Sequence, residues 1–398
     1  MRAEQKGAAR GVAFRRLTAS PFVLFRDDLA GAETHFRAPA EILRADDPSG
    51  FEAVLARAEA ARGAGKWLAG YMSYEAGYLL EPKLRPMLPA GRRTPLVCLG
   101  VFDNEPETEP ASDTTLPSNG PIFDARAAWS FRDYRPRFER LHGHLRAGDC
   151  YQGNLTFPVR AHWTGTPLSV FDALTARQPV RYGALVELGG PTIVSRSPEL
   201  FFEIDAEGWI ETHPMKGTAP RGATPAEDEA ARQGLHDDPK NQAENRMIVD
   251  LLRNDISLIS EVGTLDVPEL FRIESFPTLH QMISRVRAKL LPNLSIRDVF
   301  AALFPCGSIT GAPKIRAMEI LHELEGVPRD VYCGAIGWIA PDGRMRFSVA
   351  IRTITLFPDG EAVYNVGGGI VFDSTVEAEY EECLLKARFA TGTPPTSG

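Results

Sequence analysis

The sequence predicts an α+β fold built around antiparallel sheets. Strand-like segments occur in runs, as at residues 181–215 and 332–372, and do not alternate one by one with helices. Helical patterns flank these runs, for example at 131–148 and 375–390. Clustered strands are typical of α+β proteins, whereas strict alternation is typical of parallel α/β folds.

Composition indicates an ordinary soluble protein. The 398 residues are 43% hydrophobic and 24% charged, with a formal net charge of −8. Such values are typical of globular domains, and the length allows two or three domains or one large one. The acidic balance offers no broad cationic surface for a nucleic-acid backbone, so we expect no nucleic-acid partner.

We also expect a cytoplasmic protein. The sequence contains no run of about 18 uninterrupted apolar residues, so no membrane span is predicted. Its five cysteines are scattered, without a CxxC pair or metal-ligand spacing, and are interpreted as reduced thiols.

The N-terminal third mixes strands with one helix. PFVLF at 21–25 and PLVCLGVF at 95–102 are strand-like, and an Ala-rich helix is predicted at 50–65 after an acidic turn. Residues 103–121 are rich in Pro, Ser, Thr and acids, which favours a long surface loop or linker.

This loop divides the chain in our interpretation. We expect an N-terminal α+β region at 1–122 and a core at 123–392, which together form one intertwined unit. In the core, helices are predicted at 131–148, about 240–253, about 312–325 and about 375–390. Core strands are predicted at 151–163, 181–190, 191–195, 200–205, 209–215, 332–340, 345–357 and 362–372.

Two predicted helices carry carboxylates in unexpected places. Glu244 lies along the apolar stripe of its helix, where a carboxylate is costly to bury without a partner. It either reaches water at the stripe edge or faces a cation. On the last helix Glu379, Glu382 and Lys386 share one face, which is either solvated or part of a site. Two such helices, without a Cys/His cluster, would suit an oxygen-preferring cation such as magnesium.

Two glycine-rich segments and one lysine complete the candidate features. Pro313 is placed for the first turn of a helix, whose amides could bind an anion. GGGI at 367–370 directly follows a strand, where backbone can approach a ligand. In HPMKGTAPRG, Lys216 is predicted to lie in a tight turn, which is an unusual place for a strongly hydrated cation.

Several motifs, in order, resemble the chorismate-utilising enzymes: ENRMIVDLLRND, FPCGSITGAPK, YCGAIGW, IRT and GGGIVFDSTVEAEYEE. This family includes anthranilate synthase component I, aminodeoxychorismate synthase component I, isochorismate synthase and salicylate synthase. The resemblance covers at least residues 131–390 and implies two large antiparallel sheets packed as a sandwich with helices outside. PFVLFRDD and GYMSYEAGYLLEP resemble the amino-terminal part of the aminodeoxychorismate branch.

The resemblance implies a magnesium ion that clamps the ring carboxylate of chorismate. Glu244 and Glu382 would hold the ion, and Glu379 would assist through water or as a nearby ligand. Lys386 matches a lysine near the same carboxylate. The other substrate-binding positions implied by the resemblance are Thr218, His280, Thr310, Gly311, Tyr332, Arg352, Gly367, Gly368 and Gly369. Among these, Tyr332, Arg352 and the glycine amides would hold the enolpyruvyl carboxylate.

The implied chemistry is replacement of the C4 hydroxyl of chorismate by an amine. Glu199, in SPEL, matches the acid that protonates the departing hydroxyl, a poor leaving group without such help. Gln152 stands where isochorismate and salicylate synthases carry a lysine that activates water, which argues against water as nucleophile. Lys216, in PMKGT, matches the lysine of the aminodeoxychorismate branch, where it attacks C2 before ammonia adds at C4.

The leading expectation is therefore aminodeoxychorismate synthesis from chorismate and ammonia. No glutaminase segment is recognised, so a separate glutaminase subunit is expected to supply the ammonia. The alternatives are an anthranilate synthase component I and a catalytically inactive scaffold that binds a glutaminase. Three residues depart from the family pattern: Cys306 stands where the family usually has Gly, Gly153 where it usually has Val, and Met215 where it usually has Ile. Cys306 could narrow the binding loop and Gly153 could loosen its strand.

Overall fold

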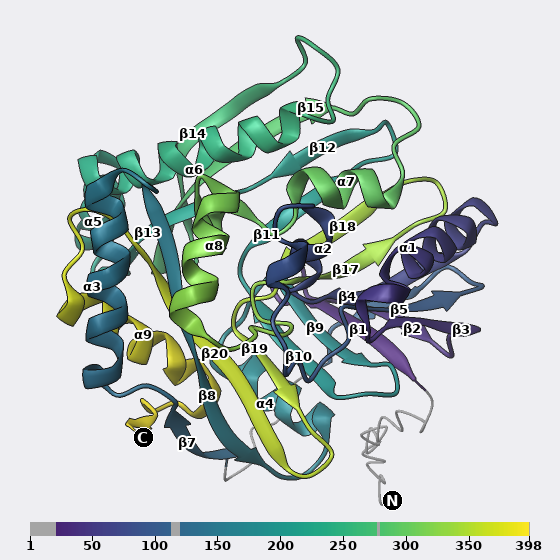
Figure 1. The fold of residues 1–398 in the computed structure, drawn as a ribbon, viewed down its shortest axis with the longest axis horizontal. Helices are drawn as coiled ribbons and strands as arrows, with labels where there is room; N and C mark the ends of the chain where they lie inside the picture. The colour runs from purple at the N-terminus through teal and green to yellow at the C-terminus, as the bar shows by residue number, and fades with distance from the viewer. Residues whose placement is uncertain (1–20, 113–119, 277–278, 398) are drawn as a thin grey trace, which may run out of the picture.

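The computed structural model describes residues 21–112, 120–276 and 279–397. In these residues, two large sheets form the centre of the molecule and helices surround them (Figure 1). The α+β prediction is confirmed. Every strand pairing is antiparallel except the short contact between β21 and β7, which is parallel.

Among the described residues, the first sheet has 11 strands. In spatial order these are β21 (Thr396–Ser397), β7 (Ile122–Ala127), β8 (Gln152–Trp163), β20 (Glu361–Ile370), β19 (Thr353–Leu356), β10 (Thr192–Ser197), β9 (Tyr182–Glu187), β1 (Phe22–Asp27), β2 (Ala32–Arg37) and β6 (Glu107–Pro110), with β16 (Gly311–Ala312) paired to β8.

The second sheet has 10 strands in the part of the chain that the structure describes. Their order is β13 (Met215–Pro220), β15 (Leu279–Lys289), β12 (Trp209–Thr212), β11 (Leu200–Ile204), β18 (Met345–Val349), β17 (Ala335–Ile339), β4 (Trp67–Met72), β5 (Val97–Phe102) and β3 (Glu41–Ala45), with β14 (Asp266–Ser275) paired to β15. Both sheets thus combine strands from before and after residue 122. We propose that regions 1–122 and 123–392 form one intertwined unit on this basis.

The helices cover the outer faces of the sheets. They are α1 (Pro48–Gly63), α2 (Ala76–Leu80), α3 (Phe131–Ala147), α4 (Pro167–Arg177), α5 (Pro225–Asp237), α6 (Pro239–Ser257), α7 (Ile296–Leu303), α8 (Lys314–Glu325) and α9 (Val376–Thr391), with short 3₁₀ turns η1 (Arg85–Met87) and η2 (Gly307–Ile309). No helix of the described residues is long and apolar enough to cross a membrane.

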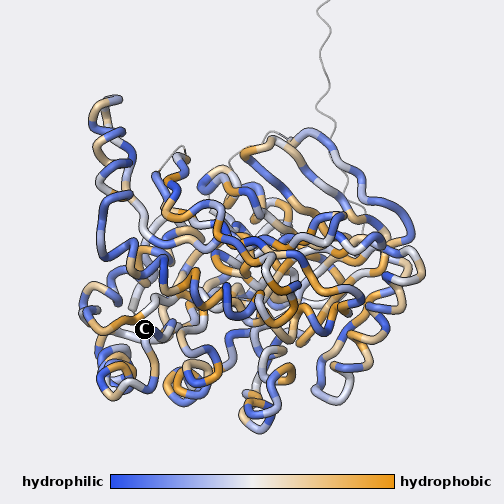
Figure 2. Tube along the Cα trace, turned by 90° about the horizontal axis from the view of Figure 1, so that it is seen from above, coloured by the Kyte–Doolittle hydropathy of each residue, from blue (hydrophilic) through white to orange (hydrophobic). Residues whose placement is uncertain are grey.

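Three large apolar clusters account for this layering. One joins the second sheet to α1, α6 and α7, and another joins the first sheet to α3, α8 and α9. A third lies between the sheets and includes Val23 and Val186 from the first and Trp67 and Ile336 from the second. Hydrophobic stretches accordingly gather toward the middle of the molecule in Figure 2. Burial of these faces drives the sandwich together.

Most predicted helices have the expected positions. The patterns at 50–65, 131–148, about 240–253 and about 375–390 correspond to α1, α3, α6 and α9 within a few residues. The helix predicted at about 312–325 is α8, which matches within two residues. Pro313 is its N-cap and does not lie in its first turn.

Other local predictions are corrected by the structure. The segment 345–357, predicted as one strand, is divided between the two sheets, because Arg352 adopts a positive φ of 52° between β18 and β19. The predicted loop at 103–121 contains β6, which pairs with β2 and has Glu107 ion-paired to Arg37. Residues 113–119 of this loop lie outside the described residues.

Lys216 does not lie in a tight turn as predicted. It lies on β13, an edge strand that pairs with β15 and has a register shift between Met215 and Thr218. Gly217 in this bulge has a φ of 79°, which glycine adopts without strain. The bulge allows β13 to present Lys216 differently from a regular strand residue.

Candidate active site

Carboxylates from α6 and α9 share one electrostatic environment. Burial raises the pKa of Glu379, and the neighbouring carboxylates of Glu382 and Glu244 raise it further. The hydroxyl of Ser374 donates a 2.6 Å hydrogen bond to Glu379 Oε1. Helices far apart in the sequence therefore bring the three predicted acids together.

These residues have the donor chemistry for a hard cation, but they do not form a complete ligand set. Among the described residues, no group of three His, Cys, Asp or Glu side chains could hold a metal ion as placed. Glu382 Oε1 is instead 2.7 Å from Lys386 Nζ, which also donates to the Gly367 carbonyl at 3.0 Å. Burial by itself would raise the pKa of Glu382, but the neighbouring ammonium group of Lys386 holds this pKa below its usual value. Lys386 thus acts as an internal counter-ion.

Gly367, Gly368 and Gly369 of β20 form a backbone surface without side chains, which we call the glycine floor. Side chains at these positions would collide with neighbouring groups. A Cβ added at Gly367 would lie 2.6 Å from the Leu155 carbonyl, and one at Gly368 would lie 2.9 Å from Glu379 Oε2. A Cβ added at Gly369 would lie 3.4 Å from Lys216 Nζ and 3.2 Å from the Gln152 amide. The absence of side chains therefore lets acids, lysine and amide converge on this strand.

Lys216 is held over this floor with a weakened affinity for protons. Burial lowers the pKa of its ammonium; Glu244 opposes the shift, and Lys386 adds to it. Gln281 Nε2 donates a 2.7 Å hydrogen bond to the Gly217 carbonyl and so supports the bulge. A lowered pKa increases the fraction of neutral amine, the nucleophilic form.

Glu199 faces the same space as a buried acid. It lies between β10 and β11 and is 7% exposed. Burial raises the pKa of its carboxyl, and a hydrogen bond from Ser308 and the charge of Lys216 oppose this. A carboxyl with a raised pKa can stay protonated near neutral pH, as a general acid must.

Arg352 is a cation without a protein anion to neutralise it. Within the described residues its guanidinium has no hydrogen bond or ion pair, and burial lowers its pKa. Tyr332 is its electrostatic neighbour and lies in the turn before β17, 8% exposed. The two predicted residues are thus brought together, and the arginine is free to bind an anion.

The loop with Thr310 and Gly311 packs directly against β8. The Thr310 hydroxyl donates to the Cys306 carbonyl at 3.1 Å, and Gly311 pairs with Gly153. A Cβ at Gly311 would lie 2.2 Å from the Gln152 carbonyl, so only glycine allows this approach. The loop therefore borders Gln152.

The departure at Gly153 has a packing reason. A Cβ added there would lie 2.8 Å from Leu141 of α3, so the glycine makes room for this side chain. The effect of Met215 on the site is not explained by the structure.

His280 and Thr218 are placed differently from the other predicted residues. Both ring nitrogens of His280 are engaged, by Ser275 Oγ at 2.8 Å and by Asp228 Oδ1 at 3.0 Å. Thr218 is exposed on β13, opposite Gln281. Neither ring nitrogen of His280 is therefore free for a ligand, and the substrate-binding roles of these two residues stay predictions.

Gln152 and Ser308 belong to the candidate site, although the sequence did not predict a role for either of them. Gln152 is 1% exposed and its Nε2 has no hydrogen-bond partner among the described residues, although it lies beside Lys216. Its sequence position had served only to exclude water as nucleophile. Ser308 contacts Glu199, but nothing in the sequence motif indicates that pairing.

A surface groove of about 530 Å³ adjoins this region and is lined by Tyr151, Ala243, Met247 and Ala312, among others.

A family profile described as chorismate binding enzyme matches residues 21–392. The chain belongs to the chorismate-binding enzyme family. Family membership agrees with the motifs of the predicted site and with the two-sheet sandwich, which is thus confirmed.

Relatives within the chorismate-binding family include two synthase types. The chain is 43% identical to aminodeoxychorismate synthase component 1 of Klebsiella aerogenes over 261 residues, which is 66% of this chain and 57% of that protein. It is 42% identical to an anthranilate synthase component 1 of Haloarcula marismortui over 255 residues, 64% of this chain and 50% of that protein. The matches thus span less than two thirds of either relative.

A solved member of the family has nearly the same extent. The crystal structure of anthranilate synthase component I from Streptococcus pneumoniae superposes with a TM-score of 0.77 at 25% identity. The match covers 98% of this chain and 95% of that one. The whole described fold, including the N-terminal strands, is thus shared.

Proposed function

We propose that this chain is an aminodeoxychorismate synthase component I. It would convert chorismate and ammonia to 4-amino-4-deoxychorismate, on the route to 4-aminobenzoate and folate, as an amine transferase of the cytoplasm. The observation that carries the proposal is the lysine of PMKGT, half-buried over the glycine floor, with a lowered pKa and an acid nearby. The similarity to the Klebsiella synthase supports the same branch.

In the proposed reaction, the neutral amine of Lys216 attacks C2 of chorismate. Glu199 gives its proton to the C4 hydroxyl, which leaves as water as the ring double bonds shift. Ammonia then adds at C4 while Lys216 is expelled from C2 as the neutral amine. The ammonium group formed at C4 returns a proton to the Glu199 carboxylate, so both the lysine and the acid are regenerated. Arg352 and Tyr332 would orient the enolpyruvyl carboxylate.

Magnesium is the proposed cofactor. Glu244, Glu379 and Glu382 would hold the ion, which would neutralise the ring carboxylate of chorismate. Lys386, now paired with Glu382, would be free to contact the same carboxylate once the ion compensates the acids. Carboxylates alone suit this hard cation better than a softer metal.

The alternative function is anthranilate synthase component I. It is favoured by the 42% identity to the Haloarcula anthranilate synthase. Incubation of the purified chain with chorismate, magnesium and ammonium, followed by mass spectrometry and chromatography, separates the two. 4-Amino-4-deoxychorismate as main product supports the proposal, and anthranilate as main product contradicts it.

The ammonia source is proposed to be a separate glutaminase subunit. Ammonium at raised pH should support turnover by the chain alone, because free ammonia is the nucleophile. Glutamine should support turnover only after a glutaminase is added. Product formed from glutamine by the purified chain alone would refute the need for this partner.

A further inference from the structure

The carboxyl of Glu199 is held by a short chain of hydrogen bonds. Ser308 Oγ donates to Glu199 Oε1 at 2.7 Å, and Cys306 Sγ lies 3.2 Å from Ser308 Oγ. Glu199, Ser308 and Cys306 are 7%, 6% and 3% exposed, so water does not compete effectively with these contacts. Cys306 and Ser308 belong to the segment around η2 and approach Glu199 from a part of the chain about 110 residues away from it.

The positions of the protons follow from the donor inventory. A serine hydroxyl has one proton, and Ser308 uses it toward Glu199. Its contact with Cys306 must therefore be a bond donated by the thiol to the serine oxygen. Burial raises the pKa of Cys306 to about 12, so the thiol keeps its proton at physiological pH. Because Oε1 is occupied as an acceptor, the acidic proton of Glu199 is left on Oε2.

We propose that Ser308, supported by the Cys306 thiol, is a positioning residue that orients the Glu199 carboxyl and adjusts its acid strength for the reaction. The inference deepens the proposed function and rests on it for the catalytic role of Glu199. It also assigns a purpose to Cys306, which departs from the glycine usual at this position in the family. The thiol would supply a hydrogen bond that glycine cannot.

The expected direction of the effect follows from the groups around Glu199. Burial raises its pKa, whereas the Ser308 hydrogen bond and the Lys216 charge from β13 lower it. Without Ser308 the carboxyl would hold its proton more tightly and become a weaker acid. Without the Cys306 thiol, the Ser308 oxygen would lose a donor and its own bond to Glu199 would weaken slightly.

Infrared titration of the carboxylic C=O stretch tests this without any substrate. Glu199→Gln should remove one band and thereby assign it. Ser308→Ala should raise the titration midpoint of that band by about one pH unit, the equivalent of one hydrogen bond to a charged group. Ser308→Thr should restore it, Cys306→Ala should raise it by less, and Cys306→Ser, which keeps a donor, should leave it nearly unchanged.

Steady-state kinetics with ammonium supply the second readout. Ser308→Ala should lower kcat about tenfold with little change in the KM for chorismate, and Ser308→Thr should recover most of the loss. An unchanged midpoint in Ser308→Ala overturns the inference. If Ser308→Ala does not fold, an unchanged midpoint in Cys306→Ala overturns the thiol's part, and failure of Ser308→Thr to match the wild type overturns the role of the serine hydroxyl. A product other than 4-amino-4-deoxychorismate would refute the proposed function and leave the infrared result to decide the hydrogen-bond chain.

Discussion

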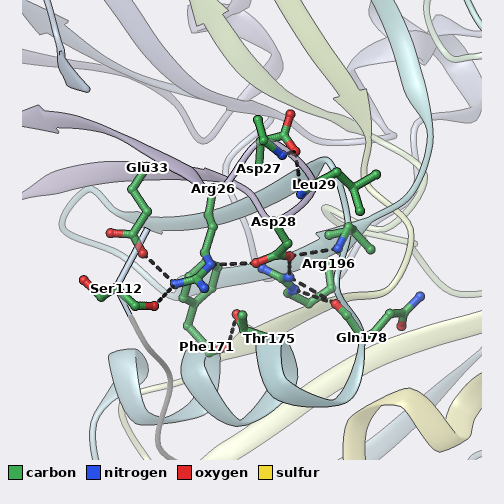
Figure 3. Close-up of polar contacts among 12 residues, drawn as sticks. Arg26, Asp27, Asp28, Leu29, Glu33, Ser112, Phe171, Thr175, Gln178 and Arg196 are labelled. Carbon is green, nitrogen blue, oxygen red and sulfur yellow. Dashed lines mark hydrogen bonds and ion pairs between the residues drawn. The ribbon is translucent and has the colours of Figure 1, made fainter. Parts of the chain in front are cut away.

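Two buried polar clusters of this molecule differ in whether their charges are neutralised by the protein itself. In the first, Arg26 donates to Asp28 Oδ1 at 2.6 Å and to Glu33 Oε1 at 2.8 Å (Figure 3). Arg196 is 0% exposed, is ion-paired with Asp28 and donates to the Gln178 carbonyl at 3.1 Å. This cluster ties β1, β2, β10 and the end of α4 together.

The candidate active site shows the opposite condition. Within the described residues, Lys216 and Arg352 have no ion-pair or hydrogen-bond partner for their charged groups, and Gln152 Nε2 is buried without one. Unpaired buried polar groups cost free energy. The comparison teaches that burial of polar groups alone does not distinguish a site from a structural cluster, because Arg196 Nη1 in the first cluster is also buried without a hydrogen-bond partner. Cations without an anionic partner do distinguish the two. Five substitutions test this distinction.

The largest effect is expected for Lys216→Ala. If the lysine is the nucleophile, 4-amino product should fall by orders of magnitude while chorismate still binds. Mass spectrometry of the quenched wild-type enzyme with chorismate and without ammonia should show an adduct on the peptide containing Lys216. Lys66→Ala, at an exposed lysine paired with Asp103, is the control and should be nearly neutral. Turnover of Lys216→Ala near the wild-type rate would show that Lys216 is not the covalent nucleophile.

Glu244→Gln and Glu382→Gln should each abolish magnesium-dependent turnover without unfolding the protein. Loss of one ligand weakens a hard-cation site, and removal of a negative charge relieves repulsion with Glu379. Turnover against magnesium concentration and thermal unfolding are the measurements. Glu381→Gln, at an exposed residue next to Glu382, is the matched control. Normal turnover at low magnesium in either variant would refute the metal assignment.

In the neutralised cluster, substitution should affect stability and spare activity. Arg196→Met removes one partner of a buried pair and should lower the free energy of unfolding by about 3 kcal/mol. Arg344→Met, which breaks an exposed pair with Asp342, should cost about 1 kcal/mol or less. Urea unfolding measures both. The assignment fails if Arg196→Met retains wild-type stability but loses turnover per folded molecule.

Glu75 is intermediate between the two clusters, because one of its carboxylate oxygens has a hydrogen-bond partner and the other has none. Its substitution should have the smallest effect on the protein. Its Oε1 accepts from the Arg329 amide at 2.6 Å, its Oε2 has no partner among the described residues, and burial raises its pKa to about 8. The native state therefore binds a proton that the unfolded state releases above about pH 4.5, and stability falls as pH rises from there toward 8.

Glu75→Gln should remove this loss of stability. The variant should be more stable than the wild type near pH 8, by an amount that grows as pH rises above about 4.5, and should differ little near pH 4, because the wild-type carboxyl is then neutral in both states. Urea unfolding across this pH range is the measurement. A stability difference that does not grow with pH would show that Glu75 is ionised and neutralised like the first cluster.

Local patterns were enough to predict much of the secondary structure. The apolar spacing of α3 and α6 and the polar breaks around them are properties of neighbouring residues, and so the sequence indicated those helices without tertiary information. The family motifs likewise located Lys216, Glu199 and the carboxylates, since a motif specifies residue types at fixed spacing.

The strand errors had a different origin. β18 and β19 read as one apolar segment, yet the backbone of Arg352 directs them into separate sheets. Lys216 was predicted in a turn because Gly and Pro surround it, whereas pairing with β15 makes the segment a bulged strand. Pairing partners far away in the chain override local preference.

By itself, then, the sequence determined the α+β class, the family and which residue types the site contains. Only the tertiary structure decided which of them remain unpaired. Long-range pairing of β8 with β20 and β16 brings Gln152, Gly369 and Gly311 together, and packing of α9 against β20 places Lys386 on the Gly367 carbonyl. Whether a charge is neutralised depends on distances and burial between segments hundreds of residues apart, and no local pattern encodes these.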